Sequence, residues 1–239
     1  MKSEERSTRR EFVQTSFAVT AAAVAVGSSL GPVSAQEKST ERPKPDAVLA
    51  SLMEGNKRFV EGRVKNPGRT LKDFQPLAAG QAPDAIILGC ADSRVPPEIL
   101  FDQGVGDLFV VRGAGNMVGS GPILKGSIEY GVGVLGARLI MVLGHSACGA
   151  CSSAIKFLED KQSLPGSIEG LVDYIRPSVR AVVGKPGDKL ANVTKANVLA
   201  GVKKLSELDP ILSKLAKSGE LKIVGAVYDL ATGRVEMVS

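Results

Sequence analysis

The chain has 239 residues, 44% of them hydrophobic, and 30 Lys and Arg against 25 Asp and Glu give a formal net charge of +5. This length and hydrophobic content suit one α/β domain. The basic residues are scattered and not interleaved with aromatic residues, so the composition argues against a nucleic-acid-binding protein.

The N-terminus has the features of an export signal. Arg9 and Arg10 precede an apolar run over residues 17–26, and a Val-Ser-Ala sequence ending at Ala35 is a small-residue cleavage site. The paired arginines resemble a twin-arginine signal, whose machinery exports folded proteins. We therefore expect residues 1–35 to be a cleaved signal peptide and the mature protein to occupy a periplasm or a thylakoid lumen. The alternative is an uncleaved, membrane-associated form, but the apolar run is shorter than the ~20 residues of a spanning helix.

A polar segment separates this signal from the predicted domain. Residues 36–45 have no apolar periodicity, and we expect them to be a flexible lead-in to a domain at 46–239. A helix is predicted from Asp46 to Val60, with Asp46 as its N-cap, because apolar residues recur there at helical spacing. The resulting apolar stripe needs a partner surface.

Four short apolar runs predict strands that are buried on both faces. They cover residues 85–88, 108–111, 139–143 and 223–227. Because helix-length segments separate them, they indicate a largely parallel sheet with helices on both sides. Cys90, Arg112 and His145 lie at or just past the carboxyl ends of three of these strands. Open α/β sheets form their sites at that edge.

The residues near these strand ends favour a zinc site. The chain has a single histidine, which excludes sites built on several histidines. His145 and Cys148 share one loop, and Cys90 offers a third soft ligand from a neighbouring strand end. A lone cysteine or histidine is more often a core residue. Here, however, Asp92 and Arg94 beside Cys90 concentrate charge at a density that is costly in a core.

The carboxylate and the guanidinium suggest how such a site works. Zinc held by two thiolates and a neutral imidazole has no net charge and acidifies its water less than a three-histidine site does. We expect Asp92 to accept a hydrogen bond from the zinc-bound water. A bidentate pair with Arg94 keeps Asp92 from becoming the fourth zinc ligand, which happens only if the site closes. With His145 used as a ligand, no histidine remains to shuttle protons, so we expect activity to rise towards alkaline pH.

The sequence resembles the β-carbonic anhydrase family in two motifs, Cys90-Ala-Asp92-Ser-Arg94 and His145-Ser-Ala-Cys148. The resemblance covers most of the mature chain and is weakest in its last third. It implies the β-carbonic anhydrase fold with an N-terminal helical arm, and reversible hydration of CO₂ to bicarbonate by zinc-bound hydroxide. It implies Zn²⁺ ligation by the two cysteines and the histidine, with Asp92 and Arg94 as the catalytic pair.

The same resemblance implies residues that contact the substrate. The family's glutamine nine residues before the first cysteine falls on Gln81, its aromatic cleft matches Phe109 and Tyr130, and its small residue after the second cysteine matches Gly149. Taken alone, Gln81 would be an exposed loop residue and the two aromatic residues would belong to a core. In the family the cleft is completed across a subunit interface. This implies a homodimer at least, with the helix that begins at Asp46 embracing the partner.

Two other functions stay open. The same ligands suit a relative that hydrolyses carbonyl sulfide or carbon disulfide, because access to the cleft selects the substrate. The second alternative is a redox dithiol, since Cys148-Gly-Ala-Cys151 is also a Cys-x-x-Cys motif. That interpretation leaves Cys90, Asp92 and Arg94 unexplained. Cys151 otherwise fills space on the helix that leaves the zinc loop.

Overall fold

The computed structural model describes residues 42–119, 121–160 and 164–238. The expected signal peptide and residues 36–41 of the lead-in lie outside these ranges. Among the described residues, no helix combines the length and the apolar composition needed to cross a membrane.

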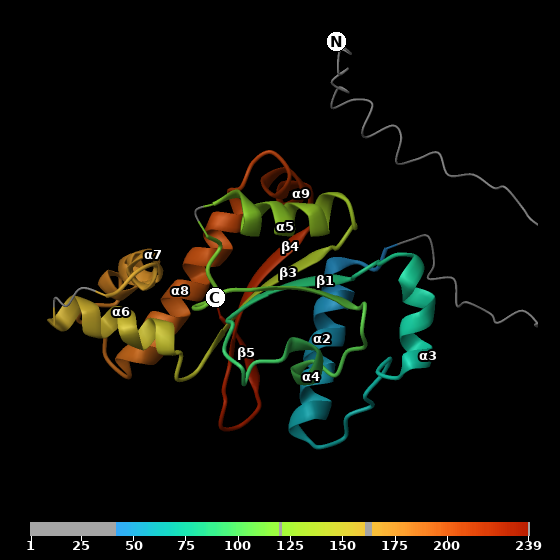
Figure 1. The fold of residues 1–239 in the computed structure, drawn as a ribbon, viewed down its shortest axis with the longest axis horizontal. Coiled ribbons are helices and arrows are strands. Elements are labelled where there is room, and N and C mark those ends of the chain that lie inside the picture. Colours follow the sequence, from blue (N-terminus) through green and yellow to red (C-terminus); the bar gives the residue numbers. More distant parts are fainter. Residues whose placement is uncertain (1–41, 120, 161–163, 239) are drawn as a thin grey trace, which may run out of the picture. The chain divides into compact units, whose positions relative to one another are not determined.

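The described chain alternates strands and helices for much of its length (Figure 1). The strands are β1 (Ala85–Gly89), β2 (Leu108–Arg112), β3 (Leu139–His145), β4 (Lys222–Tyr228) and β5 (Val235–Val238). The helices are α2 (Pro45–Val60), α3 (Leu71–Phe74), the 3₁₀ helix η1 (Gln75–Ala79), α4 (Pro97–Leu100), α5 (Pro122–Gly133), α6 (Gly149–Asp160), α7 (Ile168–Arg180), α8 (Lys189–Ser206) and α9 (Leu212–Ser218).

The five strands form one sheet in the order β2-β1-β3-β4-β5. The first four are parallel, which confirms the predicted strands and the predicted sheet type. In register, Gly89 of β1 lies opposite both Arg112 of β2 and Leu143 of β3, so β1 and β2 end side by side and β3 continues two residues further, to His145. β5 pairs antiparallel with β4 at the edge of the sheet and was not predicted. Its four residues lack the continuous apolar run of a central strand, because only one face of an edge strand is covered.

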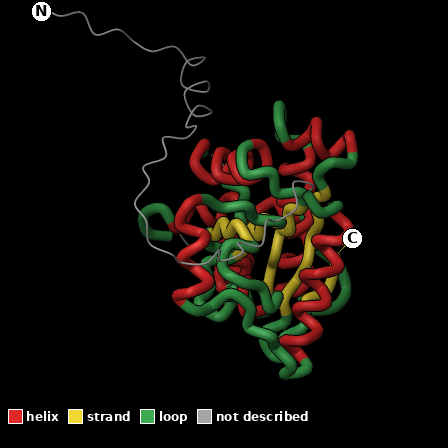
Figure 2. Tube along the Cα trace, turned by 90° about the vertical axis from the view of Figure 1, so that its right-hand side faces the viewer, coloured by secondary structure: helices red, strands yellow, loops and turns green. Residues whose placement is uncertain are grey.

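Helices cover both faces of this sheet (Figure 2). On one face α2 packs against β1 and β3, with Val48 and Leu52 only 6% and 2% exposed. On the other face α5, α8 and α9 pack on the same strands through residues such as Ile128, Val198 and Leu212. Side chains that alternate along a central strand therefore enter two different cores.

The helix predicted from Asp46 begins one residue earlier and differs in two respects from expectation. Pro45 occupies the first helical position after Lys44, and Asp46 lies in the first turn, so Asp46 is not the N-cap. Proline suits this position because its missing N–H would have no helical acceptor. The apolar stripe is buried against the chain's own sheet, so it is not presented to a partner subunit as the resemblance implied.

A third, smaller core lies beyond β3, where α6, α7 and the beginning of α8 meet. It contains Val172, Ile175 and Val193, all buried, together with the three cysteines of the chain. All three cysteines are free thiols in the structure. The carboxyl edge of the sheet therefore meets this helical core at the cysteines.

Candidate metal centre

Three side chains with metal-binding atoms converge at the carboxyl edge of the sheet. Cys90 follows the last residue of β1, His145 is the last residue of β3, and Cys148 immediately precedes α6. Their ligand atoms all lie within 4.8 Å of one another. All three side chains are buried, with 5%, 0% and 1% exposed in that order. The structure thus brings together the three residues that the sequence predicted as metal ligands.

The histidine is prepared for a metal on one of its two ring nitrogens. Nδ1 of His145 lies 2.9 Å from the carbonyl oxygen of Ser146, so this nitrogen carries the proton and donates it. Nε2 is buried and has no hydrogen-bond partner among the described residues. A buried nitrogen without a partner is costly, and metal ligation removes that cost.

The raised pKa values of the two thiols also indicate a site for a cation. Contact with Cys148, and then burial, raise the pKa of the Cys90 thiol to about 11. Contact with Cys151 contributes most to raising the pKa of Cys148, also to about 11. Two neighbouring thiolates repel each other in a buried site unless a cation lies between them. A divalent cation such as zinc satisfies that requirement and replaces the protons.

The loop between His145 and Cys148 is anchored to the hairpin that joins β4 and β5. Ser146 donates its backbone N–H to the Tyr228 carbonyl at 2.8 Å, and its hydroxyl accepts the backbone N–H of Leu230 at 2.9 Å. Ala147 has a positive φ of 54°, which turns the chain sharply towards Cys148. Contacts within the protein therefore hold this loop in place.

Asp92 and Arg94 form the bidentate pair that the sequence predicted. Nε of Arg94 lies 2.9 Å from Oδ1 of Asp92, and Nη2 lies 2.7 Å from Oδ2. Hydrogen bonds from Arg94 hold the pKa of Asp92 well below its usual range. Oδ2 of Asp92 is also 3.9 Å from Nε2 of His145, so the carboxylate borders the ligand cluster. Because Arg94 engages both oxygens, Asp92 is held outside the ligand set, which is the open arrangement.

Arg112 and Gly115 support the metal centre in ways that the sequence motifs did not reveal. Arg112 donates from Nε to the Cys90 carbonyl at 2.8 Å and from Nη2 to the Asp92 carbonyl at 2.6 Å. Gly115 donates its backbone N–H to Sγ of Cys90 at 3.3 Å. The position of Arg112 at a strand end was a usable sequence signal for its role. No sequence signal indicated the contact between Gly115 and Cys90.

The remaining predicted site residues are not among the three that form the ligand cluster. Phe109 on β2 and Tyr130 on α5 contact each other, with ring centroids 6.4 Å apart and planes at 47°. Gly149 is exposed at the start of α6, beside Cys148, with open space where a side chain would be. Gln81 is exposed in the loop before β1, whereas Cys90 follows β1, so the five-residue strand lies between them. At the usual rise that strand is roughly 17 Å long. The substrate contacts assigned to these four residues stay predictions.

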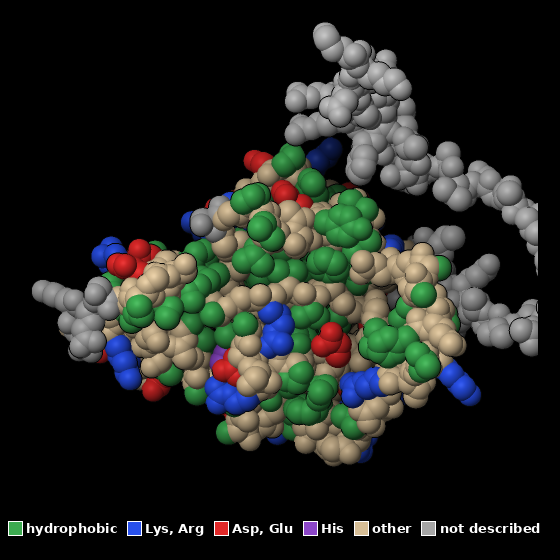
Figure 3. Space-filling model, viewed as in Figure 1, with side chains coloured by type: hydrophobic (Ala, Val, Ile, Leu, Met, Phe, Trp, Pro, Cys, Tyr) green, Lys and Arg blue, Asp and Glu red, His purple; other side chains and the backbone are tan. Residues whose placement is uncertain are grey.

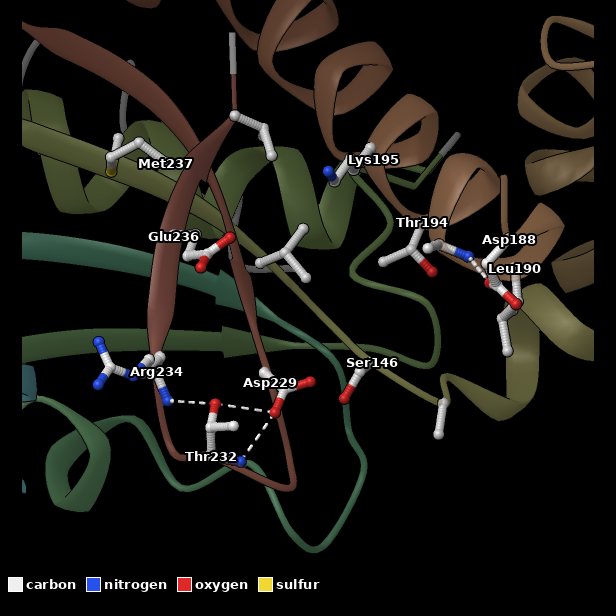
Figure 4. Close-up of a pocket in the computed structure, with 14 residues that line it drawn as sticks. Ser146, Asp188, Leu190, Thr194, Lys195, Asp229, Thr232, Arg234, Glu236 and Met237 are labelled. Atoms are coloured by element: carbon white, nitrogen blue, oxygen red, sulfur yellow. Dashed lines mark hydrogen bonds between the residues drawn. The ribbon is translucent and has the colours of Figure 1, made fainter. Parts of the chain in front are cut away.

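A cavity of about 390 Å³ lies behind the loop of Ser146, between the start of α8 and the β4–β5 hairpin (Figure 4). Its lining includes Asp188, Lys195, Asp229 and Arg234, so it carries charges of both signs. Asp229 is occupied by hydrogen bonds from the backbone and hydroxyl of Thr232, drawn in Figure 4. None of the three metal-ligand candidates lines this cavity, so it is separate from the metal centre.

Comparison with known proteins agrees with this geometry. A family model described as carbonic anhydrase matches residues 85–235. Carbonic anhydrase 2 of Mycobacterium tuberculosis is 43% identical over 193 residues, which cover 80% of this chain and 91% of that protein. A carbonic anhydrase of Pseudomonas aeruginosa is 37% identical over 197 residues, covering 79% of this chain and 86% of that one.

Solved structures show the same fold. A tetrameric β-carbonic anhydrase of Sordaria macrospora superposes with a TM-score of 0.64 at 26% identity, covering 81% of this chain and 98% of that chain. The β-carbonic anhydrase of Coccomyxa, in complex with acetazolamide, gives a TM-score of 0.63 at 30% identity, covering 79% of this chain and 85% of that chain. The predicted α/β fold is therefore confirmed.

Proposed function

The chain belongs to the β class of the carbonic anhydrase family, which hydrates CO₂ to bicarbonate and a proton, and we propose that it does so with zinc held by Cys90, His145 and Cys148. The observation that carries the proposal is the convergence of these three ligand atoms within 4.8 Å, one of them a buried nitrogen with no hydrogen-bond partner in the described part of the chain. Two sulfurs and one nitrogen suit zinc and leave its fourth position open for a water molecule. Bound there, zinc supplies the Lewis acidity that makes this water a nucleophile near neutral pH.

Asp92 and Arg94 have different roles beside that water molecule. The Asp92 carboxylate, whose Oδ2 is 3.9 Å from His145 Nε2, would accept a hydrogen bond from a water molecule at the open ligand position and so orient it for CO₂. Arg94 occupies both carboxylate oxygens from the outer side and restrains Asp92 from taking the fourth ligand position. Arg112 fixes the backbone carbonyls of Cys90 and Asp92, so the ligand and the carboxylate keep their relative positions.

The substrate contacts require a second copy of the chain. Gln81 lies at the other end of β1 from Cys90, so the Gln81 side chain that contacts CO₂ belongs to the partner subunit. Apolar side chains are exposed around α3 and α5, where hydrophobic atoms gather on one face (Figure 3). They are Leu71 (76% exposed), Phe74 (45%), Ile123 (82%), Tyr130 (46%) and Val134 (68%). Exposed apolar side chains of this size favour association, and a homodimer is the smallest assembly that could bury them on two chains.

Mixing two inactive variants tests this shared site. Gln81→Ala and Asp92→Ala subunits are unfolded, mixed and refolded with zinc, beside each variant alone. If Gln81 acts across the interface, a mixed dimer contains one intact site, and activity recovers to about a quarter of the wild-type value on random pairing. If Gln81 acts within its own chain, mixing restores nothing.

Stopped-flow CO₂ hydration on the purified protein, with zinc determined on the same sample, tests the reaction itself. We expect fast hydration with about one zinc per chain, and loss of both in Cys90→Ala. The same sample is assayed with carbonyl sulfide and carbon disulfide. Turnover of the sulfur compounds without CO₂ hydration would overturn the assignment of substrate.

Export is a separate proposal, which rests on Arg9, Arg10 and the apolar run that follows them. The signal directs the folded, metal-loaded protein to a periplasm or thylakoid lumen and is removed after Ala35. Mass spectrometry of the native protein is expected to find Gln36 as the first residue. Replacing both arginines with lysine is expected to leave the precursor in the cytoplasm. A protein that retains Met1 and remains in the cytoplasm would contradict the proposal.

A further inference from the structure

A buried asparagine on α8 is linked to the metal centre through two hydrogen bonds. Nδ2 of Asn197 donates to the carbonyl oxygen of Gly115 at 2.8 Å, and Asn197 is only 2% exposed. Gly115 in turn donates its own backbone N–H to Sγ of Cys90 at 3.3 Å. Asn197 thus contacts a residue whose backbone amide points at a candidate metal ligand.

Gly115 has an unusual and confined backbone conformation. Its φ is +73°, which favours glycine, and a Cβ there would lie 2.8 Å from Cδ1 of Ile175 and 3.2 Å from Cβ of Ala150. The loop that contains Gly115 follows β2, whereas Asn197 comes from a helix that packs on β3 and β4. The side chain of Asn197 therefore ties this loop to the body of the domain.

We propose that Asn197 is a positioning residue for the zinc site, which holds the Gly115 amide on the Cys90 sulfur and thereby sets how strongly this thiolate donates to zinc. An N–H that points at a thiolate stabilises its negative charge and reduces its electron donation to the metal. Less donation leaves zinc a stronger Lewis acid. This matters in a site with two thiolates, which by themselves weaken the effect of zinc on its water.

A merely structural role predicts a different outcome, and Asn56 provides the matched control. Asn56 is also buried, at 4% exposed, and donates to two backbone carbonyls, those of Leu100 and Gly233. These contacts join α2 to α4 and to Gly233 of the β4–β5 hairpin, and neither is made to a candidate metal ligand or to Gly115. Asn197→Leu and Asn56→Leu both remove an amide from a buried backbone carbonyl, so both are expected to lower the free energy of unfolding.

The test measures the metal site directly. Zinc affinity is determined by competition with a chromophoric chelator, and the cobalt-substituted protein reports sulfur donation through its thiolate-to-cobalt absorption band. Asn197→Leu is expected to weaken zinc binding about 10-fold to 100-fold, because Gly115 no longer holds the Cys90 sulfur firmly in place. It is also expected to shift the band to longer wavelength, because a thiolate without the N–H contact donates more strongly to the metal. Asn56→Leu is expected to change neither. An unchanged affinity and band in Asn197→Leu, or an equal loss in both variants, would overturn the proposal.

A measurement on the cadmium-substituted protein keeps the proposal testable if Asn197→Leu does not fold. Scalar coupling between ¹¹³Cd and the Gly115 amide proton, passing through the Cys90 sulfur, is expected in the wild type. In the smaller Asn197→Ser replacement this coupling is expected to weaken or vanish. No coupling in the wild type, or full coupling in Asn197→Ser, would contradict the proposed link.

Discussion

Two of the Asp–Arg pairs in the described part of the chain have surroundings that assign them opposite tasks. Asp102 has a fully buried side chain and pairs with Arg58, whose side chain is 16% exposed, at 2.7 Å. Asp92 pairs with Arg94 at the same distance of 2.7 Å, but these side chains are 17% and 56% exposed. Asp102 also accepts the backbone N–H groups of Lys65 and Asn66, within 3.1 Å.

The difference shows how the same chemical pair serves structure in one place and catalysis in another. The Asp102–Arg58 pair joins α2 to the loop after α4. Neighbouring donors occupy both carboxylate oxygens of Asp102, so no acceptor capacity is left for a ligand. Asp92 is held by one partner on its outer side, and Oδ2 remains close to His145. A catalytic carboxylate needs this incomplete enclosure, whereas a structural one needs complete satisfaction.

The largest expected effect is on the catalytic pair. Asp92→Asn is expected to lower the rate of CO₂ hydration about a thousandfold, because the neutral amide is a weaker acceptor for the attacking water and replaces one acceptor oxygen with an NH₂ donor. The pair is partly exposed, so the free energy of unfolding and the zinc content are expected to stay close to wild-type values. Stopped-flow hydration and urea unfolding on one preparation check both. Near-normal activity would remove Asp92 from the mechanism.

The structural pair is expected to give the converse result. Asp102→Asn leaves Arg58 without its counter-charge in a largely buried position, so the free energy of unfolding is expected to fall by about 3 kcal/mol. The hydration rate per bound zinc is expected to remain unchanged, because Asp102 contacts none of the candidate zinc ligands. Urea unfolding with zinc determination measures both quantities. A rate loss as large as that of Asp92→Asn would refute the division of roles.

The stabilisation that Asp102 provides is expected to depend on pH. Burial acts to raise the pKa of Asp102, but hydrogen bonds from Lys65, Arg58 and Asn66 outweigh it, so the pKa lies below its usual value. The folded state therefore binds fewer protons than the unfolded state near the ordinary Asp pKa of about 4. The stabilisation by Asp102 is present above that pH and is lost as the pH falls through the folded pKa. Urea unfolding at several acidic pH values should show the difference between wild type and Asp102→Asn shrinking below pH 4 or so. A difference that stays constant would show that Asp102 has an ordinary pKa.

Lysine in place of either arginine is expected to give the smallest effects. A lysine keeps the charge but cannot hold two oxygens in fixed geometry. Arg58→Lys is expected to lower the free energy of unfolding by about 1 kcal/mol without changing activity. Arg94→Lys is expected to lower the hydration rate about tenfold without changing stability, because Asp92 is then less firmly restrained. A lower hydration rate in Arg58→Lys, or a lower free energy of unfolding in Arg94→Lys, would show that the two pairs do not have separate roles.

The sequence by itself determined the features that depend on local order along the chain. The four parallel strands follow from short runs of apolar residues, and the ligands Cys90 and His145 follow from their places at strand ends. The Asp92–Arg94 pair is equally local, because two residues of separation after a strand bring the groups within reach. These predictions succeeded because the spacing of neighbouring residues decides which side chains share an edge.

Only the tertiary structure decided which distant residues meet. Asn197 and Gly115 are 82 residues apart, and their contact depends on how α8 lies over the sheet. The apolar stripe of α2 could have faced a partner, but it covers the chain's own strands. β5 is a strand because its four residues pair with backbone groups at the edge of β4. The sequence shows that an apolar face must be buried or that a buried amide needs a hydrogen-bond partner. Which residues bury the face or bind the amide is decided by the packing of the whole chain.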